Sequence, residues 1–164
     1  MADGMEERLK KVRAVVLDVD GVLTDAGMYY GPQGEALKKF NTRDGMGIRL
    51  LRDAGIGIAL ITGENSEAVL RRAEKLQITD VFIGVDDKLP VLEAYLEREG
   101  LSFGDIAYMG DDVNDLPCLE KAGLPCAPAD AMPPILAVAA LVTRRKGGEG
   151  AVRELADRIL DSRS

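Results

Sequence analysis

The sequence predicts an α/β fold built on a doubly wound parallel sheet. Short apolar runs alternate along the chain with longer segments that carry apolar residues at helical spacing. The runs are almost continuously apolar, as in strands that a parallel sheet buries on both faces. Several of them end in polar side chains, and open α/β sheets bind their ligands at the carboxyl ends of their strands.

Strands are predicted where a short apolar run is bounded by turn residues or charges. The clear runs, followed by two weaker ones, are residues 12–17, 57–61, 81–83, 106–109, 124–127 and 141–143. After the first run, the turn signal Gly31-Pro32-Gln33-Gly34 separates two further short segments. It predicts a β-hairpin insert over about residues 27–40.

Helices are predicted between these strands, in the order 46–54, 66–76, 88–99, 116–122 and about 150–160. Gly55 closes the first helix. In the second, an apolar stripe is formed by Val69, Leu70, Ala73 and Leu76, and Ser66 precedes them as a candidate cap. The spacing between the elements leaves no room for a separate cap domain. We therefore expect a single domain over residues 1–164.

Composition excludes several classes of function. The net charge of −7 argues against general affinity for nucleic acid or for anionic membranes, so neither is expected as a partner. With no histidine, the chain cannot build a Ser-His-Asp triad, a Cys-His pair or a histidine zinc site. Cys118 and Cys126 lack zinc spacing and are expected to be buried thiols in a reducing compartment. The sequence contains no recognisable signal peptide or membrane span, so a cytoplasmic location is expected.

Two carboxylates, Asp18 and Asp20, come directly after the first predicted strand, and Gly21 follows them. Glycine allows the chain to turn sharply at this point. Two hard oxygen ligands at the carboxyl end of a strand suit Mg²⁺ much better than zinc. The segment therefore predicts a magnesium site.

Polar residues at the other strand ends complete a set suited to phosphoryl transfer. Thr62 ends the second strand, Lys88 begins the helix after the third, and Gly110-Asp111-Asp112-Val113-Asn114-Asp115 follows the fourth. A carboxylate can attack phosphorus, and a second carboxyl can protonate the leaving oxygen. Threonine and lysine can hold phosphate oxygens while Mg²⁺ offsets their charge.

These residues resemble the motifs of the haloacid dehalogenase-like phosphohydrolases. The family pattern is Asp-x-Asp-x-x-x-Thr, a Ser or Thr that ends a second strand, a Lys, and a late acidic motif. The chain carries all four in order: Asp18-Val19-Asp20-Gly21-Val22-Leu23-Thr24, Ile61-Thr62-Gly63, Lys88 and Gly110-Asp111-Asp112-Val113-Asn114-Asp115. The resemblance implies Asp18 as nucleophile, Asp20 as general acid and base, and Thr62 and Lys88 as phosphate-holding residues.

The same resemblance implies a set of Mg²⁺ ligands. They would be the carboxylates of Asp18 and Asp111 and the backbone carbonyl of Asp20. Asp115 would support them from outside the ligand set. The resemblance leaves open whether Asp112 or Asp115 lies nearer the metal.

Further segments resemble the capless branch that dephosphorylates 3-deoxy-2-keto sugar acids, so a small phosphorylated sugar acid is the implied substrate. These segments are 25–30, Lys39-Phe40-Asn41-Thr42-Arg43-Asp44-Gly45-Met46-Gly47-Ile48 and 144–153. Glu64 follows Thr62-Gly63, where octulosonate 8-phosphate phosphatases typically have Arg, and Lys75 ends the next helix. Both features favour a nonulosonate such as KDN-9-phosphate, with 3-deoxy-D-manno-octulosonate 8-phosphate (KDO-8-phosphate) as the alternative.

Candidate substrate-binding residues are Thr42, Glu64, Arg72 and Lys75. A guanidinium suits bidentate binding of a carboxylate, which favours Arg72 as a partner of the substrate's acid group. Glu64 and Lys75 could equally be exposed residues beside a helix. Arg144, Arg145 and Lys146 could steer an anionic substrate or only solvate a loop.

Two other classes of function are more distant alternatives. One is another phosphoryl-transfer enzyme of the same superfamily, such as a phosphomutase or a phosphatase of broad specificity. A phosphomutase usually needs a cap to keep water from an aspartyl phosphate, and none is encoded. A catalytically silent regulatory scaffold is disfavoured because Asp18, Asp20, Lys88 and Asp111 are all retained.

In the resembling branch a homotetramer covers the active site. Its hairpins form a central barrel, and a neighbour's C-terminal segment reaches the site. The short hairpin of this chain fits burial in such an interface. The segment 144–164, with Gly147-Gly148-Glu149-Gly150, is the expected lid.

Overall fold

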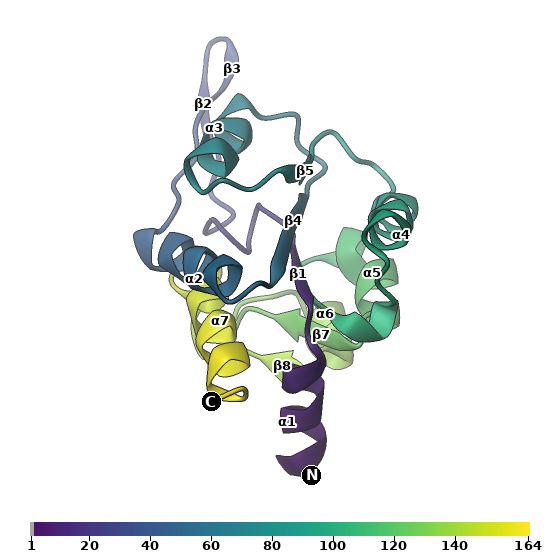
Figure 1. Cartoon of the computed structure of the whole chain (residues 1–164). Coiled ribbons are helices and arrows are strands. Elements are labelled where there is room, and N and C mark those ends of the chain that lie inside the picture. Colours follow the sequence, from purple (N-terminus) through teal and green to yellow (C-terminus); the bar gives the residue numbers. More distant parts are fainter. Residues whose placement is uncertain (1) are drawn as a thin grey trace.

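The computed structural model describes residues 2–164 and has a six-stranded parallel sheet at its centre. Its strands are β1 Ala14–Leu17, β4 Gly57–Ile61, β5 Asp80–Phe82, β6 Ile106–Met109, β7 Leu124–Ala127 and β8 Leu141–Val142. They lie in the order β5-β4-β1-β6-β7-β8, with neighbouring strands parallel (Figure 1). The α/β class with a doubly wound parallel sheet is confirmed.

The strand order reverses at β1, which has β4 on one side and β6 on the other. Leu17 at the end of β1 is in register with Leu60 of β4 and with Met109 of β6. Asp18 and Asp111, which follow Leu17 and Gly110, therefore emerge at the same edge of the sheet. Open α/β sheets bind ligands at such a reversal.

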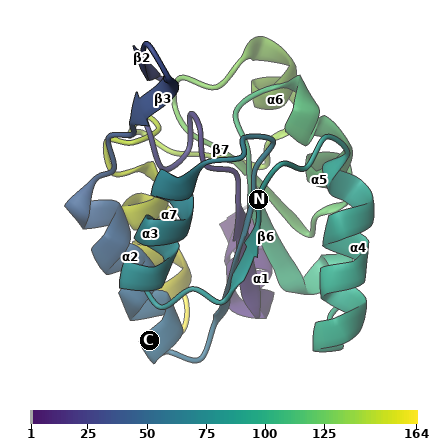
Figure 2. The same ribbon diagram turned by 90° about the horizontal axis from the view of Figure 1, so that it is seen from above.

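Helices cover both faces of the sheet (Figure 2). One layer holds α1 Ala2–Lys11, α2 Thr42–Asp53, α3 Glu67–Lys75 and α7 Ala151–Asp161, and the other holds α4 Lys88–Glu99, α5 Leu116–Lys121 and α6 Pro133–Val138. Val15 and Leu17 pack toward the first layer, whereas Ala14 and Val16 pack toward the second. This alternation buries β1 on both faces.

The predicted elements differ from the observed ones mainly at their ends. The ranges 57–61, 88–99, 106–109 and 124–127 coincide with β4, α4, β6 and β7. Helix α2 begins at Thr42 rather than residue 46, because Asn41 caps it by accepting the backbone N–H of Arg43. Ser66 lies at the N-cap position of α3, but its hydroxyl donates to Glu35 and does not cap the helix.

Two helices are missing from the sequence-based prediction. Helix α1 comes from the charged N-terminal segment and buries Leu9, while the short α6 buries Ile135. Cys118 and Cys126 are free and buried, as expected. None of the helices formed by residues 2–164 has the length and apolar character that a bilayer crossing requires.

The predicted hairpin is present as a separate two-stranded sheet that projects from the body (Figure 1). It consists of β2 Tyr29–Gly31 and β3 Gly34–Leu37. Four large apolar side chains on or beside it are between 41% and 65% exposed: Met28, Tyr29, Tyr30 and Leu37. A two-stranded hairpin has little stability of its own, so packing against another surface would stabilise it.

The N-terminus of α7 is capped by a side chain from another helix. Gly150 at its N-cap offers no side chain, and Asp44 in the first turn of α2 accepts the backbone N–H of Arg153 at 3.0 Å. Asp44 is 1% exposed. Burial raises the pKa of Asp44, and hydrogen bonds from the α7 backbone oppose that rise. The contact joins the first turn of α2 to the first turn of α7.

We expect Asp44→Ala to lower the free energy of unfolding by about 2 kcal/mol, because it leaves helix N–H groups buried without an acceptor. Urea unfolding measures the change. Asp53→Ala is the matched control at the exposed end of the same helix, and we expect it to change stability by no more than about 0.5 kcal/mol. Equal unfolding midpoints for the two variants would contradict the capping role.

Candidate active site

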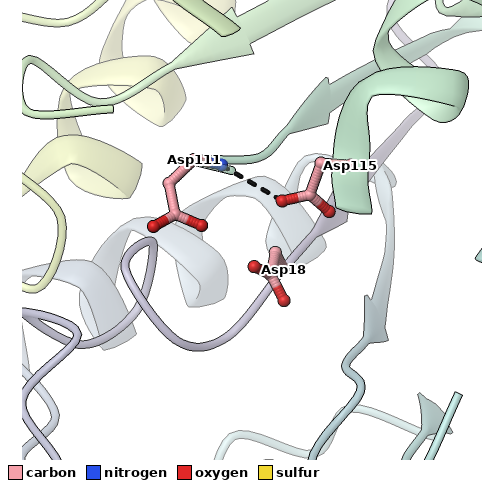
Figure 3. Close-up of side chains that lie close together, drawn as sticks. All are labelled: Asp18, Asp111 and Asp115. Atoms are coloured by element: carbon pink, nitrogen blue, oxygen red, sulfur yellow. Dashed lines mark hydrogen bonds between the residues drawn. The ribbon is translucent and has the colours of Figure 1, made fainter. Parts of the chain in front are cut away.

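Three carboxylates meet at the edge of the sheet where the strand order reverses. Asp18 follows β1, while Asp111 and Asp115 lie in the loop after β6, and one oxygen of each lies within 4.8 Å of the others (Figure 3). The backbone N–H of Asp18 donates to the carbonyl of Met109 at 3.0 Å and so extends the strand pairing. The pairing of β1 with β6 thus fixes the position of Asp18 in the cluster.

Lys88 joins two of these carboxylates. Its Nζ lies 2.8 Å from Oδ1 of Asp18 and 2.8 Å from Oδ1 of Asp115. Lys88 is the first residue of α4 and is 1% exposed. Helix α4 therefore delivers a buried ammonium group to the nucleophile predicted from the sequence.

Asp115 is the most enclosed member of the cluster. Its Oδ1 accepts hydrogen bonds from Lys88 Nζ and from the Tyr108 hydroxyl, both at 2.8 Å, and its Oδ2 accepts the backbone N–H of Asp111 at 3.1 Å. Asp112 is exposed and accepts the N–H of Val113. Of the two residues that the sequence left open, Asp115 is the one that joins the cluster.

The cluster carries more negative than positive charge. Three carboxylates face one ammonium, an excess of two negative charges if all are ionised. Burial raises the pKa of Asp18, and the charge of Asp115 adds to the rise. Burial and the charge of Asp115 likewise raise the pKa of Asp111 to about 6. A site rich in hard oxygen ligands and short of positive charge fits Mg²⁺.

Asp20 lies on the loop that leaves β1, and this loop passes close to Asp111. Gly21 has a φ of +85°, and a Cβ atom on it would lie 1.8 Å from Oδ2 of Asp111. Only glycine fits both the backbone conformation and the space. Thr24 closes the turn, because its hydroxyl accepts the N–H groups of Gly21 and Ala26 at 3.2 Å.

Thr62 directly follows β4 at the same sheet edge and is 1% exposed. Its backbone N–H donates to the carbonyl of Phe82, and its hydroxyl accepts the N–H of Glu64 at 3.2 Å. Glu64 itself is exposed. The predicted phosphate-holding residues Thr62 and Lys88 thus follow neighbouring strands on the β4 side of Asp18.

The expected lid segment, 144–164, is packed against residues 18–25, the loop that follows β1 and carries the predicted nucleophile Asp18, here called the nucleophile loop. The N–H of Gly148 donates to the carbonyl of Val22 at 3.0 Å. A Cβ atom on Gly147 would lie 1.8 Å from the carbonyl oxygen of Gly21, and one on Gly148 would lie 2.4 Å from the carbonyl carbon of Thr24. Movement of this segment as a lid stays a prediction, and it would have to break these contacts.

Three predicted substrate residues lie together, apart from the carboxylates. Thr42, Arg72 and Lys75 line a cavity of ≈ 480 Å³ between α2 and α3, and neither Asp18 nor Lys88 lines it. Arg72 donates to the carbonyl of Asn41 at 3.1 Å. Lys75 ends α3, roughly 12 Å along the helix from its start.

Comparison with known proteins identifies the family. Residues 84–155 match the family model described as haloacid dehalogenase-like hydrolase. The 3-deoxy-D-manno-octulosonate 8-phosphate phosphatase KdsC of Yersinia pestis is 44% identical over 160 residues, which cover 98% of this chain and 86% of that protein. The chain belongs to the haloacid dehalogenase-like hydrolases.

Solved structures agree with this family assignment. The 3-deoxy-D-manno-octulosonate 8-phosphate phosphatase from Yersinia pestis matches with a TM-score of 0.95 at 44% identity, covering 98% of this chain and 86% of that one. The phosphatase of the same name from Moraxella catarrhalis, solved with magnesium, phosphate and KDO, has a TM-score of 0.95 at 34% identity. That match covers 99% of this chain and 93% of the other.

Sequence reasoning missed three parts of this hydrolase's site. Tyr108 is fully buried on β6 and bonds to Asp115, although its place in an apolar run indicates a core residue only. Lys38, just after the hairpin, resembles a surface lysine in the sequence, yet its Nζ lies 2.7 Å from Oδ1 of Asp20. The packing of Gly147 and Gly148 on the nucleophile loop joins segments far apart in the chain and leaves no local signal.

Proposed function

We propose that this protein is a Mg²⁺-dependent phosphatase that hydrolyses 3-deoxy-D-manno-octulosonate 8-phosphate. The observation that carries the substrate is the 44% identity to phosphatases of that name over 98% of the chain. The buried cluster around Asp18 supports the chemistry independently. It places a carboxylate that can attack phosphorus beside the ammonium group of Lys88, which can bind the phosphate oxygens. The sequence favoured a nonulosonate, but its relatives favour the octulosonate alternative.

In the proposed reaction a carboxylate oxygen of Asp18 attacks phosphorus and forms an aspartyl phosphate, while the bond to the sugar oxygen breaks. Asp20 protonates the departing oxygen and then takes a proton from the water that hydrolyses the intermediate. Thr62 and Lys88 hold the phosphate oxygens. Asp115 keeps Lys88 in place and orients the backbone of Asp111 through the bonds described above.

Asp18, Asp111 and the backbone carbonyl of Asp20 would hold the magnesium ion. Asp115 already uses both of its oxygens for hydrogen bonds within the protein, which favours a supporting role. When bound, Mg²⁺ would offset the negative charge of the phosphate and of the carboxylate cluster.

A nonulosonate 9-phosphate is the second candidate substrate. Glu64, two residues after Thr62, favours it, because Arg is typical there in octulosonate enzymes. The proposed partner of Glu64, Lys75, is at the far end of α3 and lines the cavity between α2 and α3. Glu64 does not line that cavity, so the two residues do not share it within one chain.

We also propose that the protein assembles as a homotetramer through its hairpins. The exposed apolar side chains of Met28, Tyr29, Tyr30 and Leu37 support this, since an exposed cluster of this kind is typical of an interface.

The substrate proposal is tested by measuring kcat/KM with Mg²⁺ for KDO-8-phosphate and KDN-9-phosphate on the same preparation. We expect KDO-8-phosphate to be preferred by about tenfold or more, which corresponds to about 1.4 kcal/mol of transition-state discrimination. Removal of Mg²⁺ with a chelator should abolish hydrolysis of both. The opposite preference would assign the nine-carbon substrate, and hydrolysis of neither would refute the proposed function.

A further inference from the structure

The carboxylate of Asp20 has two oxygens in different surroundings. Oδ1 accepts a hydrogen bond from Lys38 Nζ at 2.7 Å. Oδ2 is buried and has no hydrogen-bond partner among residues 2–164. Lys38 directly follows β3, so the hairpin reaches the residue that the proposed mechanism uses as acid and base.

Lys38 is itself held by a second carboxylate. Its Nζ lies 2.8 Å from Oε2 of Glu35, and Oε1 of Glu35 accepts the hydroxyl of Ser66 just before α3. The side chain of Lys38 is 0% exposed. The buried ammonium group therefore joins the nucleophile loop to the hairpin, and the carboxylate of Glu35 extends the connection to the start of α3.

This arrangement distinguishes the two oxygens of Asp20 chemically. An ammonium group has only donors, so the oxygen that it holds must act as an acceptor. The proton that Asp20 gives to the leaving group is then carried by Oδ2, which has no competing partner among residues 2–164. Charge-assisted hydrogen bonds are short and directional, so Lys38 also limits rotation of the carboxylate.

We infer that Lys38 is a positioning residue, which holds Oδ1 of Asp20 so that Oδ2 faces the leaving oxygen and later the attacking water. This inference rests on the proposed function, because it takes Asp20 as the general acid and base. Lys38 acts through Asp20 and not on the phosphate. Glu35 and Ser66 hold Lys38 in turn.

The inference is tested by measuring how kcat/KM depends on the leaving group of the substrate, with the full-length protein and Mg²⁺. KDO-8-phosphate releases an alkoxide that needs a proton, whereas p-nitrophenyl phosphate releases an anion that is stable without one. Because kcat/KM covers only the steps up to departure of the alcohol, it reports the acid role of Asp20. The variants are Lys38→Met, Lys38→Arg and Glu35→Gln.

The adjacent lysine provides a matched control. Lys39 is exposed and pairs with Asp25 at 2.8 Å, outside the proposed machinery. Lys39→Met removes the same charge one residue away and should leave both kcat/KM values unchanged.

We expect Lys38→Met to lower kcat/KM for KDO-8-phosphate by about 10²-fold and that for p-nitrophenyl phosphate by no more than about threefold. Lys38→Arg should restore most of the loss, because it returns a buried donor to Oδ1. Glu35→Gln should lower kcat/KM by a smaller factor, and again mainly for KDO-8-phosphate. If Lys38→Met does not fold, this selectivity in Glu35→Gln decides the question.

Equal losses with the two substrates, or no loss with either, would overturn the positioning role while leaving the proposed function intact. A wild-type protein that hydrolyses neither phosphate would refute the proposed function and the inference with it. The two failures are thus distinguished by the wild-type rates.

Discussion

Asp18→Asn is expected to lower kcat/KM for KDO-8-phosphate by about 10⁴-fold or more, the scale seen when a covalent nucleophile is removed. The amide keeps the shape of the side chain but is a very poor nucleophile toward phosphorus. Asp18 is 5% exposed and shares its surroundings with two other carboxylates, so removing its charge relieves repulsion. The variant should therefore unfold at a temperature no lower than that of the wild type.

Phosphate release and thermal unfolding together check this expectation. Asp86→Asn removes an exposed carboxylate from the loop before α4 and serves as the control, with activity expected to stay near that of the wild type. An Asp18→Asn protein that keeps its activity would exclude Asp18 as the nucleophile. A variant that is inactive because it is unfolded would show instead that the carboxylate is needed for structure.

Lys88→Met is expected to affect both stability and activity. The substitution leaves two buried carboxylates, Asp18 and Asp115, without the ammonium that lies 2.8 Å from each. Removing one partner from a buried ion pair costs about 3–5 kcal/mol, because a buried charge is left uncompensated. Loss of a donor to the phosphate should lower kcat about 10³-fold in the variant that remains folded.

Urea unfolding at neutral pH and phosphate release measure these two effects. Lys121→Met is the control, since Lys121 pairs with Glu93 at 2.9 Å on the exposed surface and should contribute no more than about 1 kcal/mol. Adding Asp115→Asn to Lys88→Met should recover part of the lost stability by removing one unpaired charge. Equal stability of Lys88→Met and the wild type would mean that the buried ion pairs do not stabilise the fold.

The parts of the fold that could be predicted from the sequence are those with a strong local pattern. Strands β4, β6 and β7 are short apolar runs between turn residues, and α4 lies between Asp87 and Gly100, which cap its two ends. Helices α1 and α6 were missed for a physical reason. Helix α1 carries too many charges to resemble a core helix, and α6 begins with two prolines and is six residues long.

Some residues of the candidate site could likewise be predicted from the sequence, and others could not. Asp18, Thr62, Lys88 and Asp111 could be predicted because each follows a strand or begins a helix, and parallel strands bring such residues to one edge. The choice between Asp112 and Asp115 could not, because it depends on the short 3-10 helix after β6. That helix turns Asp115 inward and leaves Asp112 exposed.

Contacts between distant segments gave no signal in the sequence. Lys38 bonds to Asp20 across 18 residues, and Asp44 bonds to Arg153 across 109. In each case the residue type alone indicates an ordinary surface charge. Only the arrangement of the hairpin and of α7 around the nucleophile loop gives these side chains their roles.

The most direct test of the central proposal is to trap the covalent intermediate. Wild-type protein in excess over KDO-8-phosphate with Mg²⁺ is quenched with acid within one turnover, treated with borohydride and analysed by peptide mass spectrometry. Because borohydride converts an aspartyl phosphate to homoserine, we expect homoserine at position 18, and Asp18→Asn treated in parallel should show none. Homoserine at another position, or phosphate release by Asp18→Asn, would contradict the proposal that Asp18 is the nucleophile.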